Sequence, residues 1–120
     1  MKRANETREH IAMKAGARKL FQANGWVVLF EMKCVDMTAF RPGNPVIWAV
    51  EFERSAKWVE RNCRKAIGLR VDRLLIVARD ERVAEKARAI TEGMALPVGW
   101  VLITTTDELN ANFIRGRMDL

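Results

Sequence analysis

Three carboxylates, Asp36, Glu51 and Glu53, are the residues of this sequence whose types and spacing could do chemistry. Glu51 and Glu53 would project from the same face of a strand, because side chains alternate along it. If Asp36 lay opposite them on a neighbouring strand, the like charges would repel, and a divalent cation would remove that repulsion. Mg²⁺ favours one or two carboxylates together with water and phosphate oxygens. The pattern is also compatible with carboxylates on a solvated sheet face, each neutralised by an arginine.

A β-hairpin is the element that would position these carboxylates. Residues 46–53 are rich in β-branched and aromatic side chains, and the Arg-Pro-Gly-Asn-Pro run before them is a turn signal. If Phe40 faces Ile47 across the loop, the same register sets Asp36 directly opposite Glu51. Opposed side chains lie about 4.5–5.5 Å apart at Cβ, so the hairpin would bring these two carboxylates together.

The composition is that of one globular domain. The chain has 120 residues, of which 49% are hydrophobic and 30% charged, so we expect a single domain over residues 1–120 with its own core. No apolar run approaches the roughly 18 residues of a membrane span, and the N-terminus is too polar for a secretory signal. We therefore expect a cytoplasmic protein that does not associate with membranes.

The charge balance favours a polyanionic partner. Lysine and arginine number 21 against 15 acidic residues, which leaves a net charge of +6 and suits a nucleic acid. Many small proteins carry such a charge without binding anything, so it does not identify the partner by itself. Cys34 and Cys63 lack metal-ligand spacing and are expected to be buried, reduced thiols. His10, as the lone histidine, cannot make a histidine-based site by itself.

Hydrophobic and capping patterns predict elements in the order α, β, β, β, α, β, α, β, α. The expected helices cover residues 5–23, 55–68, 81–92 and 105–114; the expected strands cover residues 26–33, a segment that carries Asp36, and residues 46–53, 72–78 and 98–104. Residues 115–120 are expected to fray. This alternation predicts an α/β fold whose mixed central sheet contains an antiparallel meander and is flanked by helices.

Apolar positions indicate which faces of the first elements are buried. In the first helix, the expected buried positions are Ile11, Ala12, Ala15, Leu20 and Ala23. Lys14 is expected on the opposite, charged face. The first strand opens with five apolar residues, which is typical of a strand covered on both faces.

The helix after the hairpin combines an apolar stripe with positive charge. Its expected N-cap is Ser55; its expected buried stripe is Val59, Cys63, Ala66 and Ile67, and its basic residues are Lys57, Arg61, Arg64 and Lys65. A positive helix N-terminus beside the carboxylates would suit a phosphate bridged to a metal, although simple charge balance explains the pattern equally well. Trp58, one turn into this basic helix, is the one tryptophan for which base stacking competes with core packing.

Signatures of other enzyme classes are missing from the sequence. No glycine-rich turn follows the first strand, so neither a P-loop nor a dinucleotide fingerprint is present. A cysteine nucleophile would need a neighbouring base, and nothing in the sequence places His10 near Cys34 or Cys63. An enzyme that uses a nucleotide cofactor is therefore not expected.

In motif and element order, the sequence resembles the PD-(D/E)XK nuclease superfamily, which has the restriction endonuclease-like fold. The core of that fold is a helix, a three-strand meander, a further helix and a further strand. Its motif is an acid on the second strand and an acid-X-lysine on the third. Asp36 matches the first acid and Glu51 the second, and the resemblance in element order runs over residues 5–104.

The sequence departs from this motif at its lysine position, where it has Glu53. Some restriction endonucleases of this fold carry glutamate there, and in other members the lysine has moved to the following helix, where Lys57 is the candidate. Members often supply an acid from the first helix, a part that Glu9, or as second choice Glu6, could take.

A looser resemblance connects the chain with proteins of mobile genetic elements and DNA processing. Those proteins have a strand that ends in Glu-X-Glu, then a serine, a basic helix with asparagine and lysine, and a strand like VDRLLIVA. Here the corresponding residues are Glu51, Glu53, Ser55, Asn62 and Lys65, followed by such a strand.

The resemblance implies a Mg²⁺-dependent, or Mn²⁺-dependent, nuclease that hydrolyses DNA phosphodiesters. Asp36 and Glu51 would bind the metal, with the carbonyl of Phe52 as a third ligand, and the metal would activate water and stabilise the charge on the phosphate. Glu53 or Lys57 would orient or deprotonate that water. The residues expected to hold the DNA backbone are Arg61, Arg64 and Lys65.

Two rival interpretations remain open at this level. The first is a non-catalytic member of the same fold that binds nucleic acid or a protein partner. The second is a small α/β protein-interaction domain whose positive charge only keeps it in solution. A homodimer is compatible with all three interpretations.

Overall fold

The computed structural model describes residues 7–30 and 35–119. The elements are α1 (Arg8–Ala23), β1 (Val27–Phe30), β2 (Met37–Phe40), β3 (Trp48–Glu53), η2 (Ala56–Trp58), α2 (Val59–Gly68), β4 (Arg73–Ala78), α3 (Glu81–Glu92), β5 (Val101–Thr105), α4 (Ala111–Phe113) and η3 (Ile114–Met118). The order expected from the sequence is confirmed over these ranges. A 3-10 turn, η2, precedes α2, and a π-helical segment, η3, continues α4.

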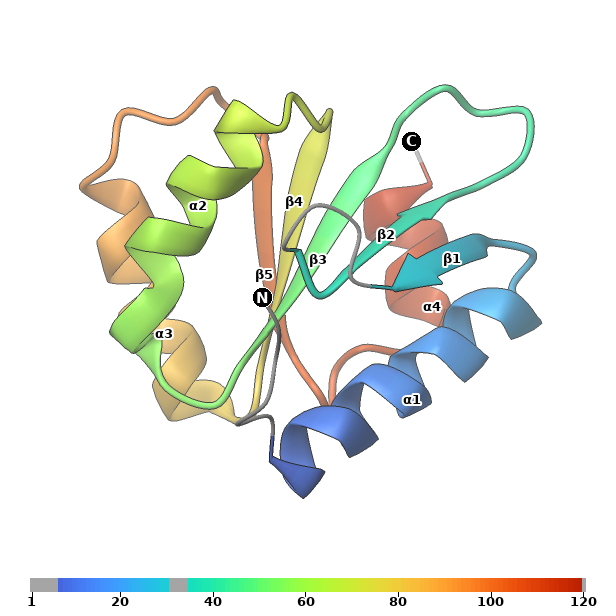
Figure 1. The fold of residues 1–120 in the computed structure, drawn as a ribbon, viewed down its shortest axis with the longest axis horizontal. Helices are drawn as coiled ribbons and strands as arrows, with labels where there is room; N and C mark the ends of the chain where they lie inside the picture. The colour runs from blue at the N-terminus through green and yellow to red at the C-terminus, as the bar shows by residue number, and fades with distance from the viewer. Residues whose placement is uncertain (1–6, 31–34, 120) are drawn as a thin grey trace.

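The described strands form one mixed sheet in the order β1-β2-β3-β4-β5. Strands β1, β2 and β3 pair antiparallel, and β3, β4 and β5 pair parallel. The parallel connections need crossover helices, which α2 and α3 supply (Figure 1). The α/β class and the helix-flanked mixed sheet predicted from the sequence are therefore confirmed.

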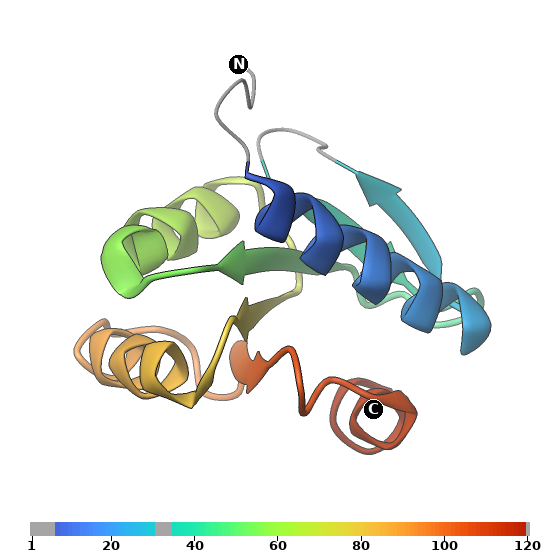
Figure 2. The same ribbon diagram turned by 90° about the horizontal axis from the view of Figure 1, so that it is seen from below.

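Helices cover the two faces of the sheet in pairs. Figure 2 shows α2 and α3 on one side and α1 with the C-terminal helical segment on the other. Buried residues divide accordingly: Ala17, Phe21, Val50, Phe52, Ile114 and Met118 belong to one cluster, and Ala49, Val59, Cys63, Ala66, Ile76 and Ala87 to the other. Strand β3 lies at the centre of the sheet and contributes alternate residues to both clusters.

The hairpin of β2 and β3 has the register predicted from the sequence. Met37 pairs with Val50 and Ala39 pairs with Trp48. Asp36, just before β2, therefore lies opposite Glu51, just after Val50. The connecting turn is compatible with its residues because Gly43 has a positive φ of 90°. The register therefore sets Asp36 beside Glu51.

Helix α1 packs through a face different from the one that its apolar residues predict. Its buried residues are His10, Lys14, Ala17 and Phe21, whereas Ile11 is exposed. The predicted burial of Ile11, Ala12, Ala15 and Ala23 and the predicted exposure of Lys14 are wrong, whereas Leu20 is partly buried against the core. Two of the four buried residues of α1 are polar. A prediction from hydrophobicity alone therefore placed the buried face on a neighbouring stripe of the helix.

Strand β1 was expected to be covered on both faces, and this expectation is wrong. Val27 and Leu29 are exposed, whereas Val28 packs against the core from the other face. β1 is an edge strand. Helices α2 and α3 lie near β4 and β5, toward the opposite edge of the sheet (Figure 1). Among the described residues, coverage of β1 is therefore limited to its face toward α1.

The start of β5 and the last helix also differ from expectation. The strand begins at Val101 because the preceding residues form a turn, in which the N–H of Trp100 donates to the carbonyl of Pro97 at 3.1 Å. The Thr105 hydroxyl accepts from the N–H of Glu108 at 3.2 Å, as its capping spacing predicts. A turn follows this bond, however, and the helix begins only after Asn110, which caps α4.

The C-terminal segment is packed, so the prediction that it frays is wrong for the described residues. Met118 is 2% exposed within the cluster on the α1 side of the sheet. Asp119 Oδ1 accepts from Nε of Arg41 at 2.6 Å, which ties the segment to the β2–β3 loop.

In the residues that the structure describes, no helix is long and apolar enough to cross a membrane.

Packing of the C-terminal segment can be tested with Met118→Ala. The substitution leaves a cavity in the core, so the free energy of unfolding is expected to fall by about 2–5 kcal/mol in urea denaturation. The control is Arg115→Ala in the same segment, at an exposed position, expected to change stability by less than about 0.5 kcal/mol. Equal, small effects of the two substitutions would contradict the packing of this segment.

Candidate functional site

The hairpin gathers the three predicted carboxylates on the face of the sheet toward α2. Asp36 and Glu51 are each 1% exposed and Glu53 is 4% exposed. Glu51 and Glu53 alternate along β3 with Val50 and Phe52, which belong to the opposite cluster. Three carboxyl groups thus share a buried location near the end of β3, and burial of charge without compensation is costly.

Asp36 is held by a backbone donor and by His10. The N–H of Phe52 donates to Asp36 Oδ2 at 2.9 Å, and His10 Nε2 lies 3.2 Å both from this oxygen and from the Phe52 carbonyl oxygen. Both of these oxygens are acceptors, so Nε2 carries the proton and donates. His10 reaches the site from the first turn of α1, where the Thr7 hydroxyl accepts from its N–H.

The carboxyl groups of Asp36 and Glu51 lie close enough for each to shift the pKa of the other. Burial and the Asp36 charge raise the pKa of Glu51 well above its ordinary value. For Asp36, burial acts to raise the pKa, but the hydrogen bonds from His10 and from the Phe52 N–H outweigh it and lower the pKa. Glu51 is therefore the weaker acid and Asp36 the stronger acid of the pair.

Glu53 is neutral for part of the time near neutral pH. Burial raises its pKa from the ordinary 4.5 to about 7, although the hydrogen bond from Asn62 opposes this rise. Asn62 Nδ2 donates to Glu53 Oε2 at 2.5 Å. Asn62 is buried on α2, whereas Ile67, predicted to be buried there, is exposed, so the carboxyl of Glu53 determines part of the inward face of this helix.

Lys65, and not Lys57, is the lysine of α2 that reaches the carboxyls. Lys65 Nζ lies 3.3 Å from Glu51 Oε2, an ion pair whose angle does not suit a hydrogen bond. The helical spacing of three residues places Lys65 on the same face of α2 as Asn62. Lys57 Nζ instead lies 4.9 Å from the ring centre of Trp58.

The other predicted site residues lie outside this cluster. Glu9 points to two arginines, with Oε1 3.2 Å from Nε of Arg54 and Oε2 3.3 Å from Nε of Arg79. Glu6 falls outside the described residues. The position expected for an acid from the first helix is taken by His10, which sequence reasoning missed, because the burial of His10 depends on a helix face that hydrophobicity did not reveal.

The two arginines expected to hold a DNA backbone lie on the outer side of α2. Arg64 Nη2 pairs with Glu60 Oε2 at 2.7 Å, and both side chains are more than half exposed. The Arg61 guanidinium lies 4.2 Å from the ring centre of Trp58. Only Lys65 among the three expected phosphate-binding residues contacts the carboxyls.

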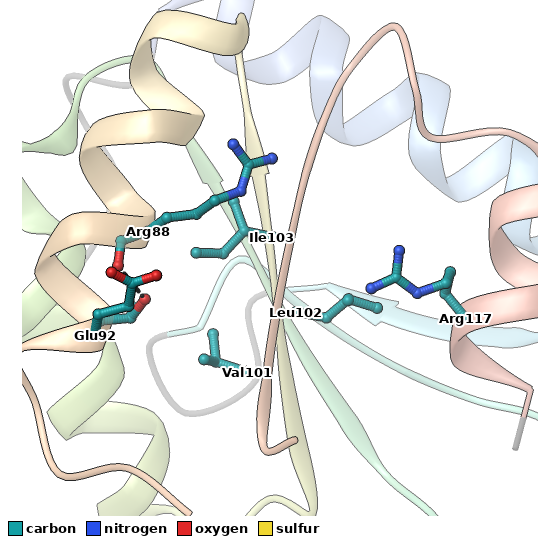
Figure 3. Close-up of a pocket in the computed structure, with 7 residues that line it drawn as sticks. Arg88, Glu92, Val101, Leu102, Ile103 and Arg117 are labelled. Carbon is teal, nitrogen blue, oxygen red and sulfur yellow. Dashed lines mark hydrogen bonds between the residues drawn. The ribbon is translucent and has the colours of Figure 1, made fainter. Parts of the chain in front are cut away.

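Two hollows on the described surface lie away from the carboxyls. One, of about 240 Å³, lies at the open edge of β5, where Figure 3 shows Arg88 and Glu92 on one side of the strand and Arg117 on the other. A groove of about 580 Å³ runs between α2 and α3, past Arg64 and Met94. Neither is lined by Asp36, Glu51 or Glu53, so the candidate site is a buried cluster beside α2 and is not part of either hollow.

In the part of the chain that the structure describes, the candidate metal-binding groups are the carboxyls of Asp36 and Glu51. Within residues 7–30 and 35–119, no group of three or more His, Cys, Asp and Glu side chains is arranged to hold a metal ion. Cys63 is buried and reduced, as predicted, and burial raises the pKa of its thiol to about 11. Cys34 lies outside the described residues. Asp36, Glu51 and the Phe52 carbonyl are the oxygens that lie together.

Comparison with known protein families, with curated proteins and with solved structures finds no match.

The raised pKa of Glu53 predicts a pH-dependent stability. In the folded chain Glu53 keeps its proton up to about pH 7, whereas an unfolded glutamate loses it near 4.5. The wild type therefore loses stability as the pH rises through this window, by about 3 kcal/mol in total. Glu53→Gln cannot ionise, so it is expected to be more stable than the wild type above pH 7 and to lose that advantage below pH 4.5.

Urea unfolding between pH 4 and pH 8 measures this difference. The matched control is Glu85→Gln, an exposed substitution on α3 that is expected to change stability by less than about 0.5 kcal/mol at any pH. A stability gain of Glu53→Gln that does not vary with pH would exclude titration of Glu53 as its cause.

Proposed function

We propose that this protein is a divalent-metal-dependent nuclease of restriction endonuclease-like fold that hydrolyses DNA phosphodiesters. The observation that carries the proposal is the buried contact between Asp36 and Glu51, made by neighbouring strands, with the Lys65 ammonium 3.3 Å from Glu51. Two acids and a lysine of this kind form the motif that the sequence resembles. The lysine comes from the following helix instead of the strand.

The arrangement of elements supports the same proposal. A helix, three antiparallel strands, a crossover helix and a parallel strand follow one another and lie in sequential order in the sheet. This is the element order of the fold that the sequence resembles, with α3 and β5 added. Fold alone does not define an activity, so the proposal depends on the site.

Asp36, Glu51 and the Phe52 carbonyl are the groups that would hold the metal. Mg²⁺ needs only one or two carboxylates, because water and phosphate oxygens complete its coordination. The pair suits a cation because one of the two carboxyls must otherwise stay protonated. A bound divalent ion would lower the pKa of a water molecule and stabilise negative charge on the phosphate.

Lys65 and Glu53 have distinct parts in this proposal. Lys65 would stabilise the charge on the phosphate and would be the motif lysine displaced to the following helix, a position for which the sequence suggested Lys57. Glu53, with a pKa of about 7, is suited to accept a proton from the attacking water, since a general base works best when its pKa is near the operating pH. Asn62 holds the Glu53 carboxyl in position through its hydrogen bond.

Substrate access requires side chains to move. Asp36 and Glu51 are almost inaccessible, and His10 Nε2 lies against both Asp36 Oδ2 and the Phe52 carbonyl. A metal at these two oxygens would therefore displace the His10 ring. The Lys65 side chain, 25% exposed, lies at the edge of the cluster and would swing outward as a phosphate enters.

The same burial favours a second candidate function, a non-catalytic domain of this fold that binds nucleic acid or a protein partner. In that case the buried carboxyl pair and the contact between Lys65 and Glu51 are permanent structural features. A buried network with its partners in place can hold a core in one arrangement. Metal uptake separates the two candidates.

Metal binding can be measured through stability and calorimetry. Binding to the folded state alone adds about 2.7 kcal/mol at a metal concentration of 100 times the dissociation constant. Mn²⁺ is therefore expected to raise the melting temperature of the wild type and to give stoichiometric heats, both of which Asp36→Asn should abolish. Glu85→Gln, at an exposed position on α3, should behave like the wild type, and a wild type that takes up no metal would support the non-catalytic candidate.

Cleavage of plasmid and oligonucleotide DNA with Mn²⁺, compared with EDTA, tests the activity directly. Asp36→Asn and Glu51→Gln are expected to abolish cleavage. Lys65→Met should lower the rate by about 10²–10³, as expected for loss of one group that stabilises the transition state. The control is Lys86→Met, at an exposed position on α3, which should keep full activity; if Lys57→Met and not Lys65→Met abolishes cleavage, the assignment of the lysine is wrong.

A further inference from the structure

Trp58 differs from the other tryptophans in being open to solvent. It is 44% exposed, whereas Trp26, Trp48 and Trp100 are at most 9% exposed. Trp58 ends η2, directly before α2. A single exposed apolar residue is ordinary, so its meaning depends on what surrounds it.

Two cations flank the Trp58 ring. The Arg61 guanidinium lies 4.2 Å and Lys57 Nζ 4.9 Å from the ring centre. Both contacts are within the range of cation–π attraction. An aromatic surface and two positive charges therefore occupy one small exposed area, which is the combination that binds single-stranded nucleic acid: bases stack on the ring and phosphates meet the cations.

Helix geometry places this area next to the carboxyls. Trp58 directly precedes α2, about one helical turn before Asn62 and two turns before Lys65. Asn62 contacts Glu53, and Lys65 contacts Glu51. The exposed area around Trp58 therefore lies about one helical turn from the Asn62–Glu53 contact, toward the start of the helix.

We infer that Trp58 is a stacking platform for an unpaired nucleobase of single-stranded DNA, with Arg61 and Lys57 binding the adjoining phosphates. The inference rests on the proposed function and specifies its substrate: a strand that is unpaired beside the phosphate that enters the carboxyl cluster. In a duplex, neighbouring base pairs cover each base face, and exposing one costs unstacking energy. An exposed indole ring therefore favours single-stranded over duplex DNA.

Binding in EDTA tests this inference without any cleavage. A short oligothymidylate is expected to quench the fluorescence of Trp58, the solvent-exposed tryptophan. Trp58→Ala should weaken its binding by about 5- to 150-fold, the loss expected from one base–aromatic stack. Trp58→Phe, which keeps an aromatic face, should recover most of the affinity but not the quenching signal; anisotropy of a labelled oligonucleotide supplies the affinity for all variants.

An abasic oligonucleotide of the same length provides the matched ligand. It has the phosphates without the bases, so the wild type should bind it more weakly than oligothymidylate, and Trp58→Ala should bind both equally. The matched control variant is Arg64→Ala, an exposed position further along α2, which should lower the affinity for both ligands by the same factor. Circular dichroism verifies that each variant is folded.

The possible outcomes separate this inference from the proposed function. If the wild type cleaves DNA but Trp58→Ala binds oligothymidylate as tightly as the wild type, the stacking inference is wrong and the nuclease proposal stands. If Trp58-dependent binding occurs without cleavage in Mn²⁺, the inference stands for a non-catalytic binding domain. A wild type that binds no oligonucleotide even at low salt overturns both.

Discussion

The contact between two carboxyl groups inside the sheet is the constraint on which the rest of this structure depends. Burial and the charge of Asp36 raise the pKa of Glu51, so ionisation of both carboxyl groups is unfavourable. Neighbouring groups compensate the buried negative charge. The Phe52 N–H and His10 contact Asp36, and the Lys65 ammonium lies beside Glu51. Each is supplied by a different element, so these elements converge on one point near the end of β3.

This convergence explains several otherwise unusual features of the packing. Helix α1 turns a histidine and a lysine inward, and α2 buries Asn62 while it leaves Ile67 exposed. Both arrangements give up apolar burial, which is normally the main driving force of helix packing. They are understandable if the helices are oriented by the polar groups near the carboxyls as well as by the apolar core.

The parallel half of the sheet provides the rigid part of the arrangement. β3 lies between an antiparallel and a parallel neighbour, and its residues are buried along its whole length. The crossover helix α2 returns along the same face and so aligns one row of its side chains with Glu51 and Glu53. A site supported by a central strand and a packed helix is more precisely positioned than one on a loop. The mobile parts would be side chains, chiefly Lys65 and the His10 ring.

Local sequence determined the elements and the register of the hairpin. Turn residues, alternation and caps are short-range signals, so the pairing that brings Asp36 to Glu51 and the cap at Ser55 could be predicted from sequence. The acidic part of the candidate site follows from that register alone. The reduced state of Cys63 follows equally from its type and spacing.

Only the tertiary structure decided which helix faces are buried and which basic residue reaches the acids. His10 and Lys65 act across long sequence distances, and neither helix periodicity nor composition ranks a polar residue as buried. The C-terminal segment gave no local signal of packing because its burial comes from Met118 and from the contact of Asp119 with Arg41. Where long-range polar contacts competed with local hydrophobic pattern, the contacts prevailed, because a buried carboxyl without partners costs more than an exposed isoleucine.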